Sequence, residues 1–192
     1  MFKKIYSGDK TSIGEEFAKK VLEYLFNNPH SPFKDIIVQS IWPDWLVSPS
    51  GHVLELDAYV EEAAFAMEFN GPYHNNPELI SKMFGITIGD ARAKVAAVAA
   101  KDKLKSEACR KRGIDLLVLK YSLSYEEIFE VCCRFVADLF NRRNADSSER
   151  VDWRDFNIDW REILSSVKRI RVENILKRFN IRQVLNEEFE DI

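Results

Sequence analysis

Two carboxylates on neighbouring predicted strands are the residues of this chain most suited to chemistry. Asp57 lies in the first strand, and Glu68 interrupts the apolar run of residues 64–69 in the second. A tight turn near residues 61 and 62 would place the two acids nearly opposite each other, about 5 Å apart. They would then repel each other, and desolvation of Glu68 would add to the cost. Because Mg²⁺ prefers a few carboxylate oxygens with retained waters, the pair predicts a metal site.

Strand alternation allows a second interpretation of Glu68, in which one face of its strand is wet. Glu68 would then point to solvent while its apolar neighbours point inward. The segment that follows favours the metal site. Asn70 and His74 place an amide and an imidazole just beyond the strand end, where functional sites gather in α/β folds.

A helix is predicted from residue 13 to about residue 26. Ser12 is a candidate N-cap with Glu15 three residues later, which is the spacing of a capping box. Apolar residues recur on one face of this helix. At about 100° per residue, Glu15 falls at the edge of the apolar face, whereas Glu16 falls roughly opposite it, in solvent.

The remaining elements are three strands in succession, a helix, a fourth strand and another helix. We expect strands at residues 36–41, 53–59, 63–69 and 114–119, a loop-like segment at 75–90, and helices at 90–112 and 125–142. This order predicts an α/β fold with a small central mixed sheet flanked by helices. A polar linker at 141–149 would lead to two or three short helices. We therefore expect a domain at residues 1–141 and a C-terminal helical extension at 142–192.

The bulk composition excludes several protein classes. A chain of 192 residues with 46% hydrophobic content suits one domain with a real core and an appendage. No apolar run approaches the ~20 residues of a membrane helix, and the N-terminus lacks the apolar core of a signal peptide. We therefore expect an intracellular, cytoplasmic protein without a membrane partner. The three cysteines show no metal-ligand spacing and indicate reduced thiols.

Charge is concentrated near the C-terminus. The net charge of −3 indicates neither a polyanion mimic nor an obvious nucleic-acid binder. Residues 167–182, however, carry six cations and one anion. Lys168, Arg169 and Arg171 are candidate nucleic-acid contacts within this segment, and a solvated amphipathic helix is the alternative.

Five motifs occur in order over roughly residues 13–130: Gly14-Glu15, Leu54-Glu55-Leu56-Asp57-Ala58-Tyr59, Ala66-Met67-Glu68-Phe69-Asn70-Gly71-Pro72-Tyr73-His74, Lys101-Asp102-Lys103-Leu104-Lys105 and residues 109–119. This ordered set resembles the PD-(D/E)XK nuclease superfamily. It looks most like the very-short-patch repair endonucleases and the homing endonucleases with an E-D-x-H-D signature. The resemblance implies a restriction-endonuclease-like fold. It also implies an enzyme that hydrolyses DNA with Mg²⁺ or Mn²⁺ in a bacterial, phage or viral host cell.

The resemblance also implies roles for individual residues. Asp57 would be the central metal ligand, and Glu68 would be the second acid, which binds or orients the metal and its water. Glu15 would complete the acidic cluster. His74 would act as general base or stabilise the scissile phosphate, and Asp102 would be the last acid of the signature. Such a set suits phosphodiester hydrolysis, because a metal activates water while a base takes its proton.

The chain departs from the family pattern at Asn70. The usual residue two positions after the second acid is a lysine, so this departure removes a cation near the attacking water. His74, Lys101 or Lys105 could substitute for it. Asn70 and Lys105 are therefore candidate catalytic residues, and Lys101 is a candidate nucleic-acid contact.

The helix predicted at residues 90–112 conflicts with the pattern at Asp102. Its packed face is bordered by Lys101 and Lys105, whereas Asp102 points away from it; the apolar residues that define this face are Ala97, Leu104 and Ala108. The family pattern thus supports Asp102, and the helical phase supports the lysines. The long connection at residues 75–100 is either a harmless insertion or a substrate-contacting loop.

The leading hypothesis is a metal-dependent DNA endonuclease that acts in homing, repair or restriction-like cleavage. It would work alone, as a homodimer or in a larger DNA-processing complex. Asn70 motivates an alternative, a catalytically silent DNA-binding or assembly module on the nuclease fold. A third hypothesis is a nuclease subunit that is active only within a larger machine, such as a transposase complex.

Overall fold

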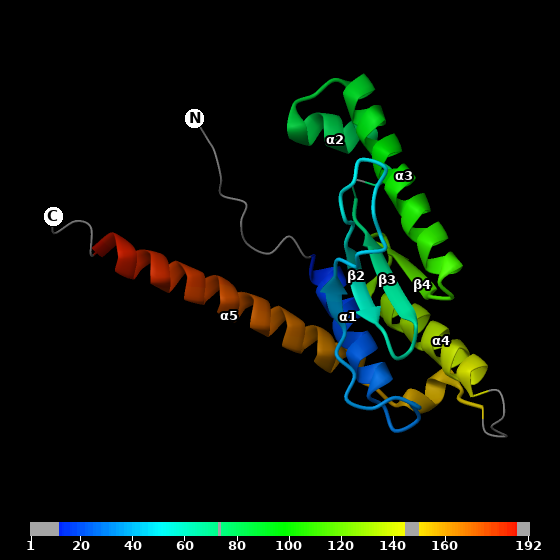
Figure 1. Ribbon diagram of the computed structural model, residues 1–192. Helices are drawn as coiled ribbons and strands as arrows, with labels where there is room; N and C mark the ends of the chain where they lie inside the picture. Colours follow the sequence, from blue (N-terminus) through cyan, green and yellow to red (C-terminus); the bar gives the residue numbers. More distant parts are fainter. Residues whose placement is uncertain (1–11, 73, 145–149, 188–192) are drawn as a thin grey trace.

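A four-stranded mixed sheet with strand order β1-β2-β3-β4 forms the centre of the structure (Figure 1). The structure is a computed structural model that describes residues 12–72, 74–144 and 150–187. The first three strands, β1 (Gln39–Ile41), β2 (Leu56–Val60) and β3 (Phe65–Asn70), are antiparallel neighbours. The fourth, β4 (Asp115–Lys120), runs parallel to β3. The α/β class and the mixed sheet flanked by helices are therefore confirmed.

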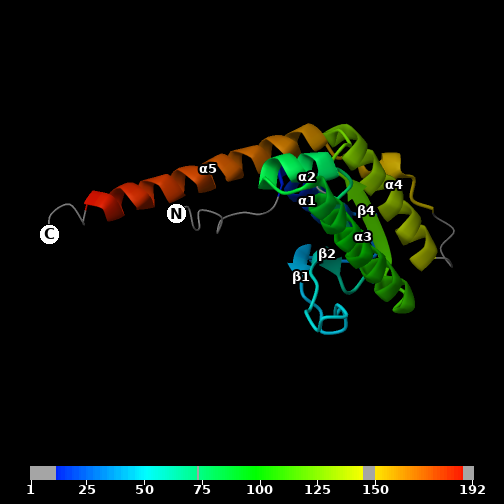
Figure 2. The same ribbon diagram turned by 90° about the horizontal axis from the view of Figure 1, so that it is seen from above.

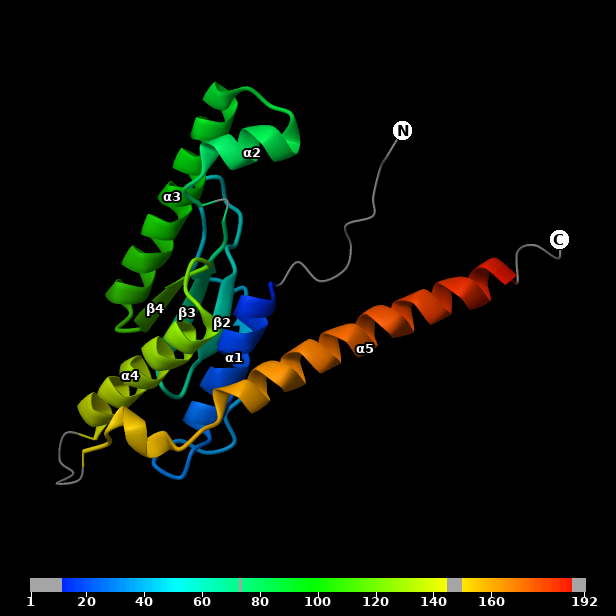
Figure 3. The ribbon, with the colours of Figure 1, turned by 180° about the vertical axis from the view of Figure 1, so that it is seen from behind.

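Helices cover both faces of this sheet (Figures 2 and 3). On one face α1 (Ile13–Phe26) and α4 (Tyr125–Arg143) pack on the larger core. On the other face the C-terminal half of α3 (Ile88–Lys111) packs on a smaller core. After the short 3-10 helix η1 (Trp153–Phe156), α5 (Trp160–Glu187) lies against α1 at its start and then extends away from the body.

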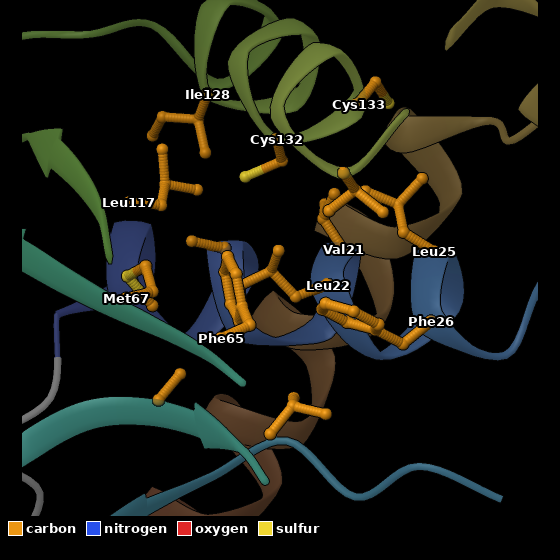
Figure 4. Close-up of a cluster of buried hydrophobic side chains, with 14 of the residues drawn as sticks. Val21, Leu22, Leu25, Phe26, Phe65, Met67, Leu117, Ile128, Cys132 and Cys133 are labelled. Carbon is orange, nitrogen blue, oxygen red and sulfur yellow. The ribbon is translucent and has the colours of Figure 1, made fainter. Parts of the chain in front are cut away.

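The larger core holds α1 and β3 in place (Figure 4). Phe26 of α1 packs on Phe65 of β3, with ring centroids 5.1 Å apart. The side chains labelled in Figure 4 are buried and come from α1, α4 and two strands: Val21, Leu22, Leu25, Phe26, Phe65, Met67, Leu117, Ile128, Cys132 and Cys133. All three cysteines of the chain are free and buried, as expected. Since Glu15 lies on α1 and Glu68 on β3, this core also fixes two candidate site residues.

A helix forms where the sequence led us to expect a loop. In α2 (Pro77–Phe84), the side chain of Asn76 accepts a hydrogen bond from the backbone N–H of Leu79 at 2.8 Å. Pro77 occupies the first helical position, and Gly85 ends the helix with a φ of 62°. The proline and the glycine are therefore the start and stop signals of a helix, and the expectation of a loop at residues 75–90 was wrong.

The C-terminal segment also differs from expectation, because α5 is one helix of 28 residues. No proline or glycine lies within α5, so nothing in its backbone divides it into the expected two or three short helices. The expected linker at 141–149 begins inside α4, and its residues 145–149 lie outside the described part. Within the described ranges, no helix is long and apolar enough to cross a membrane.

Candidate active site

Asp57 and Glu68 face each other across β2 and β3. The register pairs Ala58 with Met67, and one step further along the same register Asp57 stands opposite Glu68. Because side chains alternate along a strand, Glu68 shares the sheet face of Ala66, which packs into the smaller core beneath α3. The tight turn expected from the sequence thus brings the two acids together.

Glu68 is buried, with 6% of its surface exposed, so its expected alternative position on a wet strand face is wrong. The face opposite the larger core is covered here by α3, whose Lys105 Nζ donates a hydrogen bond to Glu68 Oε2. The other oxygen, Oε1, is buried without a hydrogen-bond partner. Burial raises the pKa of the Glu68 carboxyl to about 7; the negative charge of Asp57 adds to this rise, and Lys105 opposes it.

Asp57 is also held through one of its two oxygens. Its Oδ2 accepts a hydrogen bond from the backbone N–H of Phe69 at 2.8 Å. Among the described residues, no hydrogen bond is formed to Asp57 Oδ1. Each acid therefore gives one oxygen to the fold, and Asp57 Oδ1 and Glu68 Oε1 remain for a ligand.

Glu15 approaches this pair from the start of α1. As expected, Ser12 caps the helix, and its Oγ accepts a hydrogen bond from the Glu15 backbone N–H at 3.1 Å. The Glu15 side chain instead accepts from Lys19 Nζ at 2.7 Å. Burial raises the pKa of the Glu15 carboxyl, the hydrogen bond from Lys19 opposes this rise, and the charge of Asp57 raises the pKa further.

Lys19 and Ser40 link Glu15 to β2, and neither was expected from the sequence. Lys19 Nζ also donates to Ser40 Oγ at 2.9 Å, and Ser40 Oγ donates to the backbone carbonyl of Asp57 at 3.0 Å. Lys19 stands four residues after Glu15, so helical spacing could have identified it. Nothing local in the sequence indicates Ser40, because its contacts are made across the fold.

His74 and Asp102 form a second pair beside the acids. His74 Nδ1 lies 3.0 Å from Asp102 Oδ2, and both side chains are partly exposed. An ionised carboxylate only accepts hydrogen bonds, so Nδ1 is assigned as the donor, and Nε2 remains for a substrate or water. The negative charge of Asp102 contributes to the raised pKa of Glu68, which places the two pairs within electrostatic reach of each other.

The expectation that Asp102 points away from the packed face was therefore wrong. Of the apolar residues expected to define that face, Leu104 and Ala108 pack on the smaller core, whereas Ala97 is exposed. The residues of α3 that are buried or half-buried include Asp102 and Lys105 as well as the apolar residues: Ala91, Val95, Val98, Asp102, Leu104, Lys105, Ala108 and Cys109. This face turns Asp102 toward the loop that carries His74.

Lys105 supplies the cation that β3 lacks. Asn70 stands two residues after Glu68 and shares its face of the strand, but an amide carries no charge. The ammonium of Lys105 reaches Glu68 from α3 instead. Lys101 is exposed and forms no ion pair with an acid of the described site, so it does not join the cluster.

The candidate nucleic-acid contacts on α5 lie apart from these acids. Arg171 Nη1 is 3.4 Å from Glu16 Oε1, so Glu16, which was expected in solvent, is partly covered by α5. Lys168 Nζ lies 5.5 Å from the centre of the Tyr125 ring, and Arg169 is exposed. The segment is basic as expected, but two of its three candidate contacts already interact with the fold.

The ligand set suits a hard divalent cation. Asp57 and Glu68 offer one carboxylate oxygen each, and oxygen ligands favour Mg²⁺ or Mn²⁺. In the described part of the chain, no three His, Cys, Asp or Glu side chains are grouped so as to hold a metal. A bound ion would therefore complete its coordination with water or substrate oxygens, as Mg²⁺ commonly does. The buried, unpartnered Glu68 Oε1 fits such an ion.

Comparison of the chain with protein-family models, curated proteins and solved structures returns no significant match.

Proposed function

We propose that this chain is a metal-dependent DNA endonuclease of the PD-(D/E)XK type with a restriction-endonuclease-like fold. The observation that carries the proposal is the buried Glu68, which faces Asp57 and has one oxygen without a partner. Burying an unsatisfied carboxylate oxygen is costly for a fold. Asp57 and Glu68 would hold Mg²⁺ or Mn²⁺ with their remaining oxygens, which would remove this cost and relieve the repulsion between the two acids.

The residues around the pair support hydrolysis of a phosphodiester. Asp57 and Glu68 would hold a divalent ion, whose chemistry would supply a coordinated water of lowered pKa and positive charge beside the phosphate. Lys105 orients Glu68 and offers positive charge close to the reaction. His74 Nε2 accepts the proton of the attacking water or donates a hydrogen bond to the scissile phosphate, and Asp102 holds the ring in that orientation.

Glu15 contributes negative charge beside the two acids. Its carboxyl is held by Lys19 and adds negative charge near Asp57, which strengthens attraction for a cation. The contact from Lys19 through Ser40 to the Asp57 carbonyl couples α1 to the strand that carries the central acid.

A catalytically silent DNA-binding or assembly module is the second candidate, and Asn70 favours it. No cation stands at that position of β3, so the activity depends on Lys105 from another element. The two candidates differ in a single readout, which is strand cleavage in the presence of metal.

The test is cleavage of supercoiled plasmid by the purified chain in Mg²⁺ or Mn²⁺. We expect nicked or linear product with metal and none with EDTA. Asp57→Asn should lower the rate at least ~100-fold, whereas Asp44→Asn, which changes an exposed aspartate in the segment after β1, should leave it unchanged. DNA binding without cleavage in Mg²⁺, Mn²⁺ and Co²⁺ would favour the silent module. Cleavage by Asp57→Asn at the wild-type rate would reject the site.

A further inference from the structure

Three lysines form a row along α3 that begins at the candidate active site. Lys105 contacts Glu68, and Lys101 and Lys94 follow at intervals of four and seven residues toward the helix N-terminus. At 3.6 residues per turn, these spacings keep all three within about 40° around the helix axis. With a rise of 1.5 Å per residue, the lysine row (Lys94, Lys101 and Lys105) is about 17 Å long.

The lysine row lies on the flank of α3 that faces β2. Arg112, at the C-cap, is seven residues after Lys105 and therefore continues the same flank. Its guanidinium lies 4.5 Å from the centre of the Trp45 ring. Trp45 packs on the smaller core with Leu56, the first residue of β2. The flank is therefore directed toward the strand on which Asp57 follows Leu56.

The far end of the row belongs to a helical arm that projects beyond the sheet. This arm is formed by α2 and the first half of α3 (Figure 1). Lys94 Nζ lies 6.0 Å from the centre of the Phe84 ring of α2, so α2 supports the lysine farthest from the acids. The expected connection at residues 75–100 is thus an ordered arm with Asp102 and Lys105 at its base.

The charge of the outer lysines is not balanced by the acids closest to them in sequence. Thr87 Oγ1 donates to Asp90 Oδ2 at 2.8 Å as part of the α3 N-cap, and Asp102 is engaged by His74. Among the described residues, Lys94 and Lys101 form no ion pair, and both are exposed. The row therefore presents positive charge to solvent beside the acidic pair.

We infer that the lysine row is a phosphate track, along which the backbone of the DNA follows α3 away from the scissile bond. This inference rests on the proposed function and deepens it by assigning residues that hold the substrate. A mononucleotide or a short diester would reach Lys105 alone. Lys94 lies about 17 Å from Lys105 along the helix, so it can contact only a longer polyanion. This length corresponds to roughly five nucleotides of a B-form strand at 3.4 Å each.

The first test compares two double variants with the same change in net charge. Lys94→Gln/Lys101→Gln, called here the outer-row variant, removes the two lysines of the row that lie farthest from Glu68. Arg92→Gln/Lys103→Gln removes two exposed cations from the opposite flank of α3 and serves as the control. Binding of a 30-base-pair duplex is measured by fluorescence anisotropy between 50 and 200 mM salt in Ca²⁺, and thermal melting confirms that each variant is folded.

We expect the outer-row variant to reduce the slope of log Kd against log salt by about 1.8, because each lost phosphate contact contributes ~0.9. The ratio of its Kd to the wild-type Kd should therefore fall roughly tenfold between 50 and 200 mM salt. The control should keep the wild-type slope. Equal slopes in the outer-row variant and the wild type, or an equal loss in the control, would overturn the track.

The second test separates the track from the proposed function. The outer-row variant should lower kcat/KM for the duplex about tenfold and leave hydrolysis of thymidine 5′-p-nitrophenyl phosphate unchanged. If the wild type cleaves DNA and the outer-row variant matches the control, the track is rejected and the endonuclease stands. If the wild type neither binds nor cleaves DNA, both proposals are rejected.

Discussion

Lys105 of α3 forms an ion pair with Glu68 of β3 inside the candidate active site. It brings a cation to a strand that has the neutral Asn70 two residues after Glu68. The pair satisfies one oxygen of Glu68 and leaves the other buried without a partner. An unsatisfied buried acceptor costs about 1–3 kcal/mol. Such a cost is commonly retained where function requires it.

The raised pKa of Glu68 predicts a specific dependence of stability on pH. The folded state binds this proton up to a pKa of about 7, against an ordinary value of 4.5. The wild type therefore loses stability as the pH rises from about 4.5 to 7, by up to ~3 kcal/mol. Glu68→Gln lacks this titration, so its free energy of unfolding relative to the wild type should rise across the same window.

Urea denaturation at several pH values between 4.5 and 8 measures this difference. Glu61→Gln, at an exposed residue in the β2–β3 turn, is the matched control for the loss of one carboxylate. A flat difference for Glu68→Gln would show that the carboxyl is not buried as described.

The His74–Asp102 contact predicts that the two residues act as one unit. His74→Gln should lower kcat about 10²- to 10⁴-fold, the range for loss of a general acid or base. Asp102→Asn should lower it roughly 10- to 100-fold, because the ring remains but is less well oriented. The double variant should be no slower than His74→Gln, because Asp102 acts through the ring.

Single-turnover cleavage of a labelled duplex gives these rates, and duplex affinity in Ca²⁺ serves as the control for substrate binding. Fully additive losses in the double variant would mean that Asp102 acts independently of His74.

Gly14 predicts a packing effect on the site. A Cβ at this position would lie 2.7 Å from Cζ of the buried Phe69 ring, and the Phe69 backbone N–H holds Asp57. Gly14→Ala should therefore cost about 1–3 kcal/mol of stability and weaken Mn²⁺ binding by displacing Phe69.

Gly89 provides the matched substitution, because it too is the second residue of a helix. A Cβ there would meet only Thr87 Oγ1, at 3.6 Å, so Gly89→Ala should stabilise the protein by about 0.4–1 kcal/mol. Thermal unfolding and calorimetric titration with Mn²⁺ report both quantities. Equal effects of the two substitutions would argue against the close approach of α1 to Phe69.

Local patterns in the sequence were sufficient to predict most of the strands and the opposition of the two acids. Alternation and a tight turn specify the register of β2 and β3, so the opposition of Asp57 and Glu68 follows from local chemistry. The cap at Ser12 follows in the same way.

What the sequence did not reveal depends on contacts between distant elements. The burial of Glu68 requires α3 to cross the sheet, and the partial cover on Glu16 requires α5 to return to α1. The phase of Asp102 was misjudged because Ala97 belongs to the part of α3 that projects beyond the sheet. Periodicity identifies a packed face only where a partner surface exists.

The most direct test of the metal site is a crystal structure of the wild type soaked with Mn²⁺, with anomalous scattering measured at the manganese edge. We expect a peak within coordination distance of Asp57 Oδ1 and Glu68 Oε1, with His74 nearby, and no such peak in Asp57→Asn crystals. A saturated soak that leaves this position empty, or a peak held by other residues, would contradict this prediction.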